Sequence, residues 1–387
     1  MRRRHVLRAS VLALVPVLLS GGRPASATQE HPAKHAKNPA AKITTAKPAS
    51  RVAAKPVSPP SGPGITTEAE LPTAYSGPIT AFWSTGDSGE FVSTRGNNVH
   101  IHYLRFIHPN ADTAIVLSAG RTECLIKYKE WAYDLHRNGF SVFLHDDRGQ
   151  GFSTRLLDDP MIGYVDEFAD YVADLKTFFD EQVKPTDHKH HVLVGFSMGG
   201  CIASLYLEEH QRDFDRAVLC SPMHEPKLPV SEASLFAVSA MDTVGLGDRY
   251  VPGGQPYDLV RELDLATNEL THSPTRWEHA WDEYNAKPST KLGSASVHWV
   301  RVAYAAGRTA QDRAGRIVVP ILLLQAGDDV VVLASAQNRF HARLNSAHPN
   351  SCTLVKIDGA RHDLFGESDA YRTPTLEHIL AFASFKS

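Results

Sequence analysis

Three kinds of side chain in this sequence could together perform nucleophilic chemistry: the hydroxyl of Ser197, the carboxylate of Asp328 or Asp329, and the imidazole of His362. A serine hydroxyl is a weak nucleophile at neutral pH, so it needs a neighbouring base, and the base needs a carboxylate that orients it. Each candidate follows an apolar run typical of a buried strand, and the chain order is serine, aspartate, histidine. This pattern predicts acyl transfer through a covalent intermediate on Ser197.

The serine lies in the G-x-S-x-G pattern of residues 195–199, which taken alone often matches by chance. Its context makes it more specific, because an apolar run at 191–194 precedes it and an apolar-faced stretch at 198–208 follows it. A projecting nucleophile requires a strand, a sharp turn and a helix in this order. We expect the glycines to remove Cβ atoms that would collide in the turn. The alternative is a glycine-rich helix start that Ser197 merely caps.

A helix that starts after Ser197 would offer unpaired N–H groups and the positive end of its dipole to a developing oxyanion. We expect two backbone donors at this place. One is the N–H of Met198, directly after the nucleophile. The other is the N–H of Arg121, because Gly120 permits a close approach in the loop that follows the apolar run 114–117.

The elements that must position these residues alternate along the chain between short apolar runs and amphipathic stretches. Predicted strands cover 99–106, 114–117, 140–144, 191–194, 217–219, 317–324 and 352–357, and predicted helices cover 128–138, 168–178, 198–208 and 374–385. This alternation predicts an α/β fold with a mostly parallel sheet, helices on both faces, and a site at the carboxyl ends of the strands. Residues 222–315 lack a clean buried strand and predict an inserted cap between two core parts, 65–221 and 316–387.

Seven motifs make the chain similar to a known family. They are SAGRTECLIKYKEWAYDL, HDDRGQGFSTRLLDDP, GYVDEFADYVADL, GFSMGG, NELTHSPTRW, LLLQAGDD and GARHDLFGE. The sequence resembles, over about residues 90–385, the serine hydrolase branch of the α/β-hydrolase superfamily that contains bacterial lysophospholipases and monoacylglycerol lipases.

The resemblance implies the α/β-hydrolase fold with an inserted cap, and it implies no metal or organic cofactor. It assigns Ser197, Asp329 and His362 as the catalytic triad, and Arg121 and Met198 as oxyanion donors. The family spacing is what favours Asp329 over Asp328. Many relatives have His-Gly where this chain has Ala-Gly at 119–120, and Asp-His where it has Asp-Asp at 146–147. These departures leave the substrate preference open.

The expected activity is hydrolysis of single-chain lipid esters, either lysophospholipids or monoacylglycerols. In the predicted cap, four aromatic residues could line an acyl pocket or, as an alternative, belong to the core: Trp277, Trp281, Trp299 and Phe236. Two other functions stay open. The same triad could serve an acyltransferase that passes the acyl group to an alcohol, or the fold could be a non-catalytic envelope protein that binds lipid.

The N-terminal segment has a composition of its own. A basic start, an apolar run at 9–19 and the small residues before position 28 predict a signal peptide over 1–27, hence a periplasmic or secreted protein. Its arginines also resemble a twin-arginine signal. Residues 28–64, rich in Ala, Lys and Pro, predict a disordered spacer with six basic residues and one acidic one. This spacer could contact a membrane or cell wall, or simply be solvated.

Charge and cysteine content exclude other classes. Without residues 1–64 the chain has 29 basic and 42 acidic residues, a net charge of −13, which argues against binding nucleic acid. The four cysteines, Cys124, Cys201, Cys220 and Cys352, would permit two disulfides. The apolar surroundings of Cys201 and Cys220 instead favour buried free thiols at those two positions. The cysteines lack zinc-site spacing, and the histidines at 188–191 fit the polar start of a strand better than a metal site. The oligomeric state stays open.

Overall fold

The computed structural model describes residues 64–227, 232–257 and 268–385. The predicted signal peptide and all but the last residue of the predicted spacer lie outside these ranges. Export and contact of the spacer with an envelope surface therefore stay predictions.

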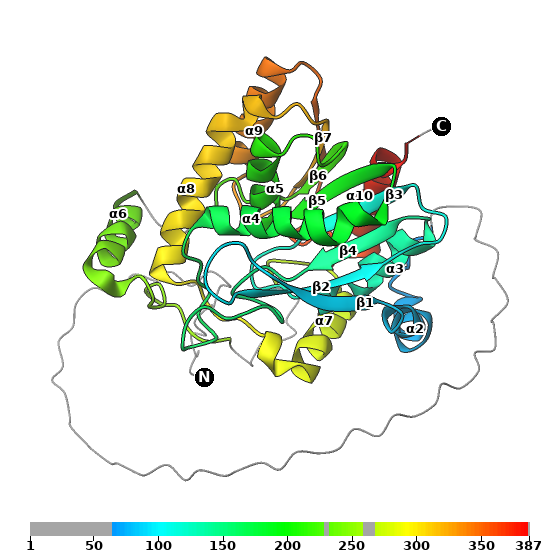
Figure 1. Cartoon of the computed structure of the whole chain (residues 1–387), viewed down its shortest axis with the longest axis horizontal. Coiled ribbons are helices and arrows are strands. Elements are labelled where there is room, and N and C mark those ends of the chain that lie inside the picture. The colour runs from blue at the N-terminus through cyan, green and yellow to red at the C-terminus, as the bar shows by residue number, and fades with distance from the viewer. Residues whose placement is uncertain (1–63, 228–231, 258–267, 386–387) are drawn as a thin grey trace, which may run out of the picture.

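The described residues form one eight-stranded sheet in the order β1-β2-β4-β3-β5-β6-β7-β8 (Figure 1). Its strands are β1 (Asp87–Val92), β2 (His100–Phe106), β3 (Thr113–Ser118), β4 (Ser141–His145), β5 (His190–Phe196), β6 (Arg216–Cys220), β7 (Ile321–Ala326) and β8 (Cys352–Ile357). The first two strands pair antiparallel, and β2 is antiparallel to β4. All pairs from β4 to β8 are parallel, so six strands end at the same edge of the sheet.

Helices cover both faces of this sheet, which explains why its central strands are apolar throughout. In β3 the side chains of Ala114 and Val116 join one hydrophobic cluster, and those of Ile115 and Leu117 join the other. The first cluster includes residues of α4 (Phe168–Phe178), α5 (Met198–Glu209), α8 (Val297–Arg313) and α9 (Ala334–Ala347). The second includes residues of α3 (Lys129–Arg137) and α10 (Asp369–Ala383). The predicted α/β fold is confirmed.

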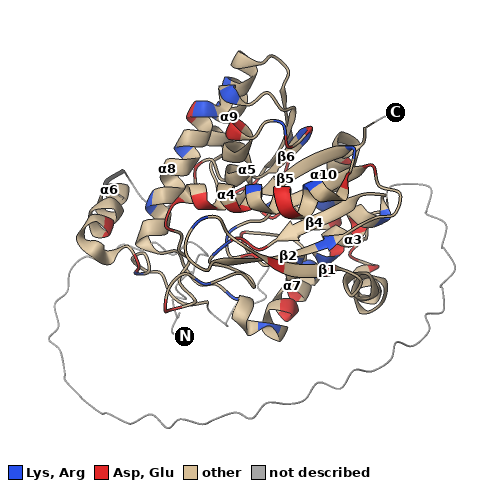
Figure 2. Ribbon diagram, viewed as in Figure 1, with Lys and Arg blue, Asp and Glu red and all other residues tan. Residues whose placement is uncertain are grey.

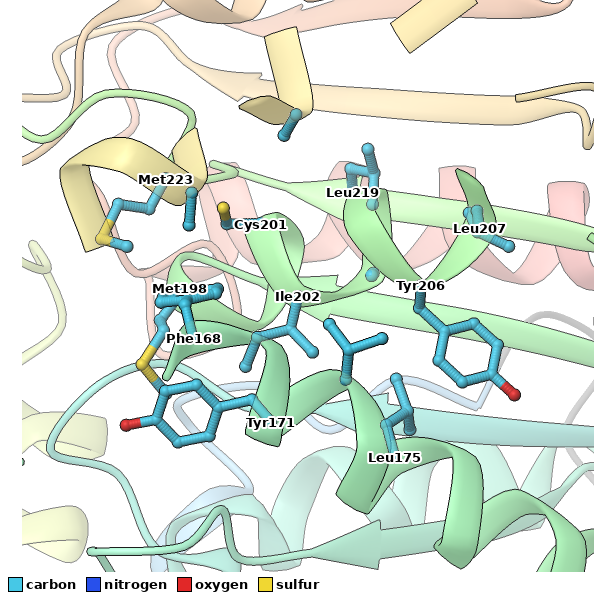
Figure 3. Close-up of a cluster of buried hydrophobic side chains, with 14 of the residues drawn as sticks. Phe168, Tyr171, Leu175, Met198, Cys201, Ile202, Tyr206, Leu207, Leu219 and Met223 are labelled. Carbon is cyan, nitrogen blue, oxygen red and sulfur yellow. The ribbon is translucent and has the colours of Figure 1, made fainter. Parts of the chain in front are cut away.

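The packing of α4 on α5 illustrates how the pattern produces the layer. Phe168, Tyr171 and Leu175 recur at helical spacing along α4 and are buried. Figure 3 shows them in one cluster with Met198 and Ile202 of α5. This contact fixes the start of α5 against the sheet, directly after residue 197.

Several predicted boundaries were wrong. The strand predicted for 317–324 begins at Ile321, because Pro320 lacks the N–H that a ladder position requires. The last helix begins at Asp369 and contains Pro374, which was predicted as its start. The strand β1 and the short helices α1 (Leu71–Ala74) and α2 (Thr80–Trp83) were not predicted. Proline at positions 72 and 78 obscured the helical pattern there.

The predicted insertion 222–315 contains α6 (Glu232–Met241), α7 (Pro274–Ala286) and α8 among its described residues. In Figure 1, α6 lies apart from the sheet, whereas α8 lies beside α5. The side chains of Ala303, Ala306 and Ala310 in α8 are buried in the cluster of the sheet face. The second half of α8 thus belongs to the layer that covers the sheet, and the cap boundaries stay a prediction.

Two further features concern chemistry and charge. The four cysteines are buried and free, which agrees with the buried thiols expected at Cys201 and Cys220. Figure 2 shows acidic and basic residues interspersed along the helices of the described part. In those same ranges, every helix is too short or too polar to span a bilayer.

Candidate active site

Ser197, His362 and Asp329 form a hydrogen-bonded chain at the carboxyl edge of the sheet. The Oγ of Ser197 lies 2.8 Å from Nε2 of His362, and Nδ1 of the same imidazole lies 2.8 Å from Oδ2 of Asp329. The three residues follow β5, β8 and β7, and the parallel order of these strands brings them together. The imidazole and the carboxylate are both almost completely buried.

The turn at Ser197 is strained in the way expected from the sequence. Its φ of +51° and ψ of −114° are unusual for a residue with a side chain. A Cβ on Gly195 would lie 2.6 Å from the carbonyl oxygen of Gly199, and one on Gly199 would overlap the carbonyl oxygen of Ser118. The glycines are therefore required by close backbone approach. Hydrogen bonds hold the strained residue, since its N–H donates to the carbonyl of Cys220 at 3.0 Å.

The structure shows which of the two candidate carboxylates, Asp328 or Asp329, contacts His362. Asp329 is 4% exposed at its side chain, and its Oδ1 accepts the N–H groups of Val331 at 2.8 Å and Val332 at 3.0 Å. These two bonds orient the other oxygen toward His362. Asp328 is exposed, and only its backbone is engaged here, donating to the carbonyl of Ala360 at 2.8 Å.

Burial and charge act in opposite directions on the pKa values of this pair. Burial raises the pKa of Asp329, but the charge and hydrogen bond of His362 together with two backbone N–H groups bring it below its ordinary value. Burial lowers the pKa of His362, but the charge and hydrogen bond of Asp329 and the charges of Asp363 and Glu123 bring it above its ordinary value. The site therefore favours an imidazolium beside a carboxylate, which is the charge distribution that forms when histidine takes a proton from serine.

Both expected oxyanion donors lie next to the turn. Met198 is the first residue of α5, so its N–H has no acceptor within the helix. The loop after β3 lies directly against this turn, because Ser118 touches Gly199. In that loop the N–H of Gly120 donates to Glu123 Oε2 at 2.9 Å, whereas the N–H of Arg121 makes no hydrogen bond within the described part of the chain.

Residues 109–369 match the family model described as serine aminopeptidase, S33. The chain belongs to this family. Over 310 residues it is 35% identical to lysophospholipase L2 of Escherichia coli strain K12, an alignment that covers 79% of this chain and 90% of that protein. The probable lysophospholipase L2 of Haemophilus influenzae is 30% identical over 294 residues, covering 75% of this chain and 90% of the relative.

Solved structures of the same fold agree with this membership. A soluble variant of monoglyceride lipase from Saccharomyces cerevisiae, in complex with a substrate analog, superposes with a TM-score of 0.59 at 16% identity. The superposition covers 77% of this chain and 95% of the yeast chain, which shows that the fold is shared. The chain is thus an enzyme of the hydrolase class with the α/β-hydrolase fold, and its named relatives are esterases and lipases.

One part of the site was not predicted: the network that holds residues 119–123, the loop after β3 that carries the expected donor Arg121 and is called the oxyanion loop below. Glu123 accepts the hydroxyl of Tyr128 and pairs with Lys127, whose ammonium also lies 2.7 Å from Oδ2 of Asp363. Gln150 adds a second hold, since its Nε2 donates to the carbonyl of Gly120 at 2.8 Å. The local pattern did not indicate this network, because Glu123 lies in a loop before the short helix Leu125–Tyr128.

The structure separates the four aromatic candidates for the acyl pocket. Trp277 and Trp281, both on α7, line a cavity of about 470 Å³ including its mouth, together with Thr122 of the oxyanion loop. Trp299 is buried in the core, where its Nε1 donates to the hydroxyl of Tyr171 at 3.2 Å. Phe236 on α6 is 76% exposed. Of the four, only Trp277 and Trp281 therefore line this cavity.

Of the histidines around the start of β5, His188 has structural partners for both ring nitrogens. His188 lies 2.8 Å from both the hydroxyl of Thr186 and that of Ser141, and His190 is the first residue of the strand. The guanidinium of Arg148, after β4, binds the carboxylate of Asp174 on α4.

Proposed function

We propose that this chain hydrolyses the carboxylic ester of single-chain lipids, with lysophospholipids as the preferred class, through an acyl-enzyme on Ser197. The observation that carries the proposal is the continuous hydrogen-bonded chain from Ser197 through His362 to Asp329, set on a strained turn. Lysophospholipase names of the relatives with 35% and 30% identity support the substrate class.

In the first half-reaction the Oγ of Ser197 forms a bond to the acyl carbonyl carbon while Nε2 of His362 takes its proton. The carbonyl electrons move to the oxygen, which the N–H groups of Arg121 and Met198 stabilise. The C–O bond to the glycerol then breaks, and His362 donates its proton to that leaving oxygen. Asp329 stays ionised throughout and stabilises the imidazolium.

In the second half-reaction water takes the place of the glycerol. His362 accepts a proton from water as the water oxygen attacks the acyl carbon, and a second tetrahedral species forms at the same donors. The bond from the acyl carbon to Ser197 Oγ breaks, and the proton returns to Oγ. A free fatty acid leaves, and the enzyme is restored.

The cavity beside Trp277 and Trp281 supports an apolar chain as the acyl part of the substrate. Aromatic side chains four positions apart on α7 present one face, and they adjoin Thr122 of the oxyanion loop. One cavity of this size suits one acyl chain, which supports a lysophospholipid or a monoacylglycerol as substrate.

The test replaces the nucleophile. Ser197→Ala is expected to lower kcat on lysophosphatidylcholine and on a short-chain aryl ester by roughly 10⁴-fold or more, because the covalent step is lost. It should also abolish labelling by a fluorophosphonate probe. The matched control is Ser346→Ala, since Ser346 is exposed on α9 and bonds only the carbonyl of Ala342. Undiminished turnover of both esters by the Ser197 variant would end the proposal.

A further inference from the structure

The guanidinium of Arg121 is held beside the site but is incompletely bonded. Its Nη2 donates to the carbonyl of Gly293 at 2.8 Å, and its carbon lies 5.0 Å from the ring centre of Trp299. Its Nε is buried and has no hydrogen-bond partner among the described residues. Its Nη1 likewise has no hydrogen-bond partner among the described residues. The guanidinium thus keeps N–H groups that the described residues do not satisfy.

Among the described residues, the three buried arginines each have an acidic partner, whereas the half-buried Arg121 has none. Arg148 binds Asp174, Arg276 binds Glu130, and Arg372 binds Asp134. Within the described ranges, Arg121 has no carboxylate within ion-pair distance. Burial lowers the pKa of its guanidinium to about 10, so the group is still a cation at neutral pH. A partly buried cation without a counter-ion is costly unless a ligand supplies the negative charge.

The loop that fixes this guanidinium carries a second cation of the same kind. Lys291 is almost completely buried, two residues before Gly293, and its ammonium donates to Oδ1 of Asn285 at 2.6 Å. It also lies 5.3 Å from the ring centre of Tyr257 and 5.5 Å from that of Trp281, which line the cavity described above. No carboxylate of the described residues pairs with it. The wall around 289–293 therefore presents positive charge that the protein itself leaves unbalanced.

The position of Arg121 matches the dimensions of a lysophospholipid. Its backbone N–H is the proposed donor to the ester oxyanion, and an extended arginine places its guanidinium roughly 6–7 Å from its own Cα. In a lysophospholipid the glycerol separates the ester carbonyl carbon from the phosphorus by roughly 6–8 Å, at about 1.5 Å per bond. One residue can therefore reach both groups of the same molecule.

We propose that the side chain of Arg121 is the phosphate-binding residue of this site and recognises the headgroup phosphate of a lysophospholipid. This inference rests on the proposed function. Arginine suits the role because its planar N–H groups can donate in pairs to phosphate oxygens. The contact gives the enzyme a preference for phosphate-bearing esters over neutral glycerol esters.

The test compares two substrates that carry the same acyl chain, a 1-acyl-lysophosphatidylcholine and a 1-monoacylglycerol. Arg121→Met should lower the ratio of their kcat/KM values, lysophospholipid over monoacylglycerol, by about 10- to 100-fold, the usual worth of a charged hydrogen bond. Arg121→Lys keeps the charge but loses the paired donors, so its ratio should lie between those of the Met variant and the wild type. Arg343→Met is the matched control, because Arg343 is exposed on α9 and pairs with Asp312.

A second measurement uses headgroup fragments as inhibitors of aryl ester hydrolysis. sn-Glycerol 3-phosphate should compete in the wild type and lose this effect in Arg121→Met. Equal losses of kcat/KM on both lipid substrates would overturn the proposal, because the guanidinium would then only support the loop. Inhibition by inorganic phosphate that persists in the variant would also overturn it, since the anion would bind elsewhere. Failure of the proposed function is distinguishable, because it would leave both substrates turned over by Ser197→Ala.

Discussion

Arginine side chains are held in different ways in two regions of the molecule, beneath the segment that begins at Gly64 and in the loop after β3. In the first region Arg276 and Arg372 share the carboxylate of Glu130, and Arg372 also binds Asp134 at 2.8 Å. Remaining donors there reach backbone carbonyls, including that of Thr66. In the loop after β3, by contrast, Arg121 keeps two unbonded donor atoms.

The difference separates polar groups that stabilise the fold from those that await a ligand. A buried ion network tolerates burial only when its charges and hydrogen bonds are matched within the protein. We propose that the unbonded N–H groups of Arg121 gain their hydrogen bonds and their counter-charge when a substrate phosphate binds. Substitutions in the first region should therefore change stability, and substitutions in the second should change rate or substrate preference.

The largest effect expected is on rate, from the carboxylate that orients the base. Asp329→Asn should reduce kcat by roughly 10⁴-fold, because the amide removes the charge that stabilises the imidazolium and can hold the wrong tautomer. Steady-state kinetics on an aryl ester would measure it. Asp328→Asn is the matched control, and its exposed side chain should leave kcat nearly unchanged. Equal effects of the two variants would contradict the assignment.

The next effect is on stability, in the matched network. Arg372→Met should lower the free energy of unfolding by roughly 3–5 kcal/mol, because it leaves the buried carboxylates of Glu130 and Asp134 short of a partner. Chemical denaturation would measure the loss. Arg343→Met, which breaks an exposed pair with Asp312, should cost less than about 1 kcal/mol. The folded Arg372→Met variant should keep its kcat. If its kcat fell as far as that of Asp329→Asn, the assignment of the first region to stability alone would be wrong.

The smallest effect expected is a shift of the pH profile. Because Asp329 holds the pKa of His362 above its ordinary 6.5, the base becomes protonated as pH falls through a value above 6.5, and kcat/KM should fall with it. In Asp329→Asn the lowering by burial is less opposed, so the acid limb of the residual activity should move to lower pH. Profiles of kcat/KM between about pH 5 and 9 would measure the acid limb of the wild type and that of the variant. A wild-type limb below that of the variant would refute the direction of coupling.

The strand ends were predictable from the sequence, since each of Ser197, Asp329 and His362 follows an apolar run and parallel strands end at one edge. The choice between Asp328 and Asp329 was not predictable from the run itself. It depended on the family spacing, and the structure shows its local cause in the two N–H donors that turn Asp329 toward His362.

Contacts distant along the chain could not be predicted. The bond from Arg121 to Gly293 spans 172 residues, and nothing in the local pattern around either residue indicates it. The aromatic residues of 222–315 divide between cavity and core according to how α7 and α8 pack. Periodicity shows that Trp277 and Trp281 share a face, but it does not show which neighbour that face meets.

The order of the sheet has a consequence for incomplete copies of this protein. The imidazole follows β8, which is the last strand in the chain and an outer strand of the sheet, 165 residues after the hydroxyl it activates. A polypeptide that stops before this strand carries the alcohol without its proton acceptor. On the proposed mechanism, ester cleavage therefore requires a chain that extends through β8 and the loop after it.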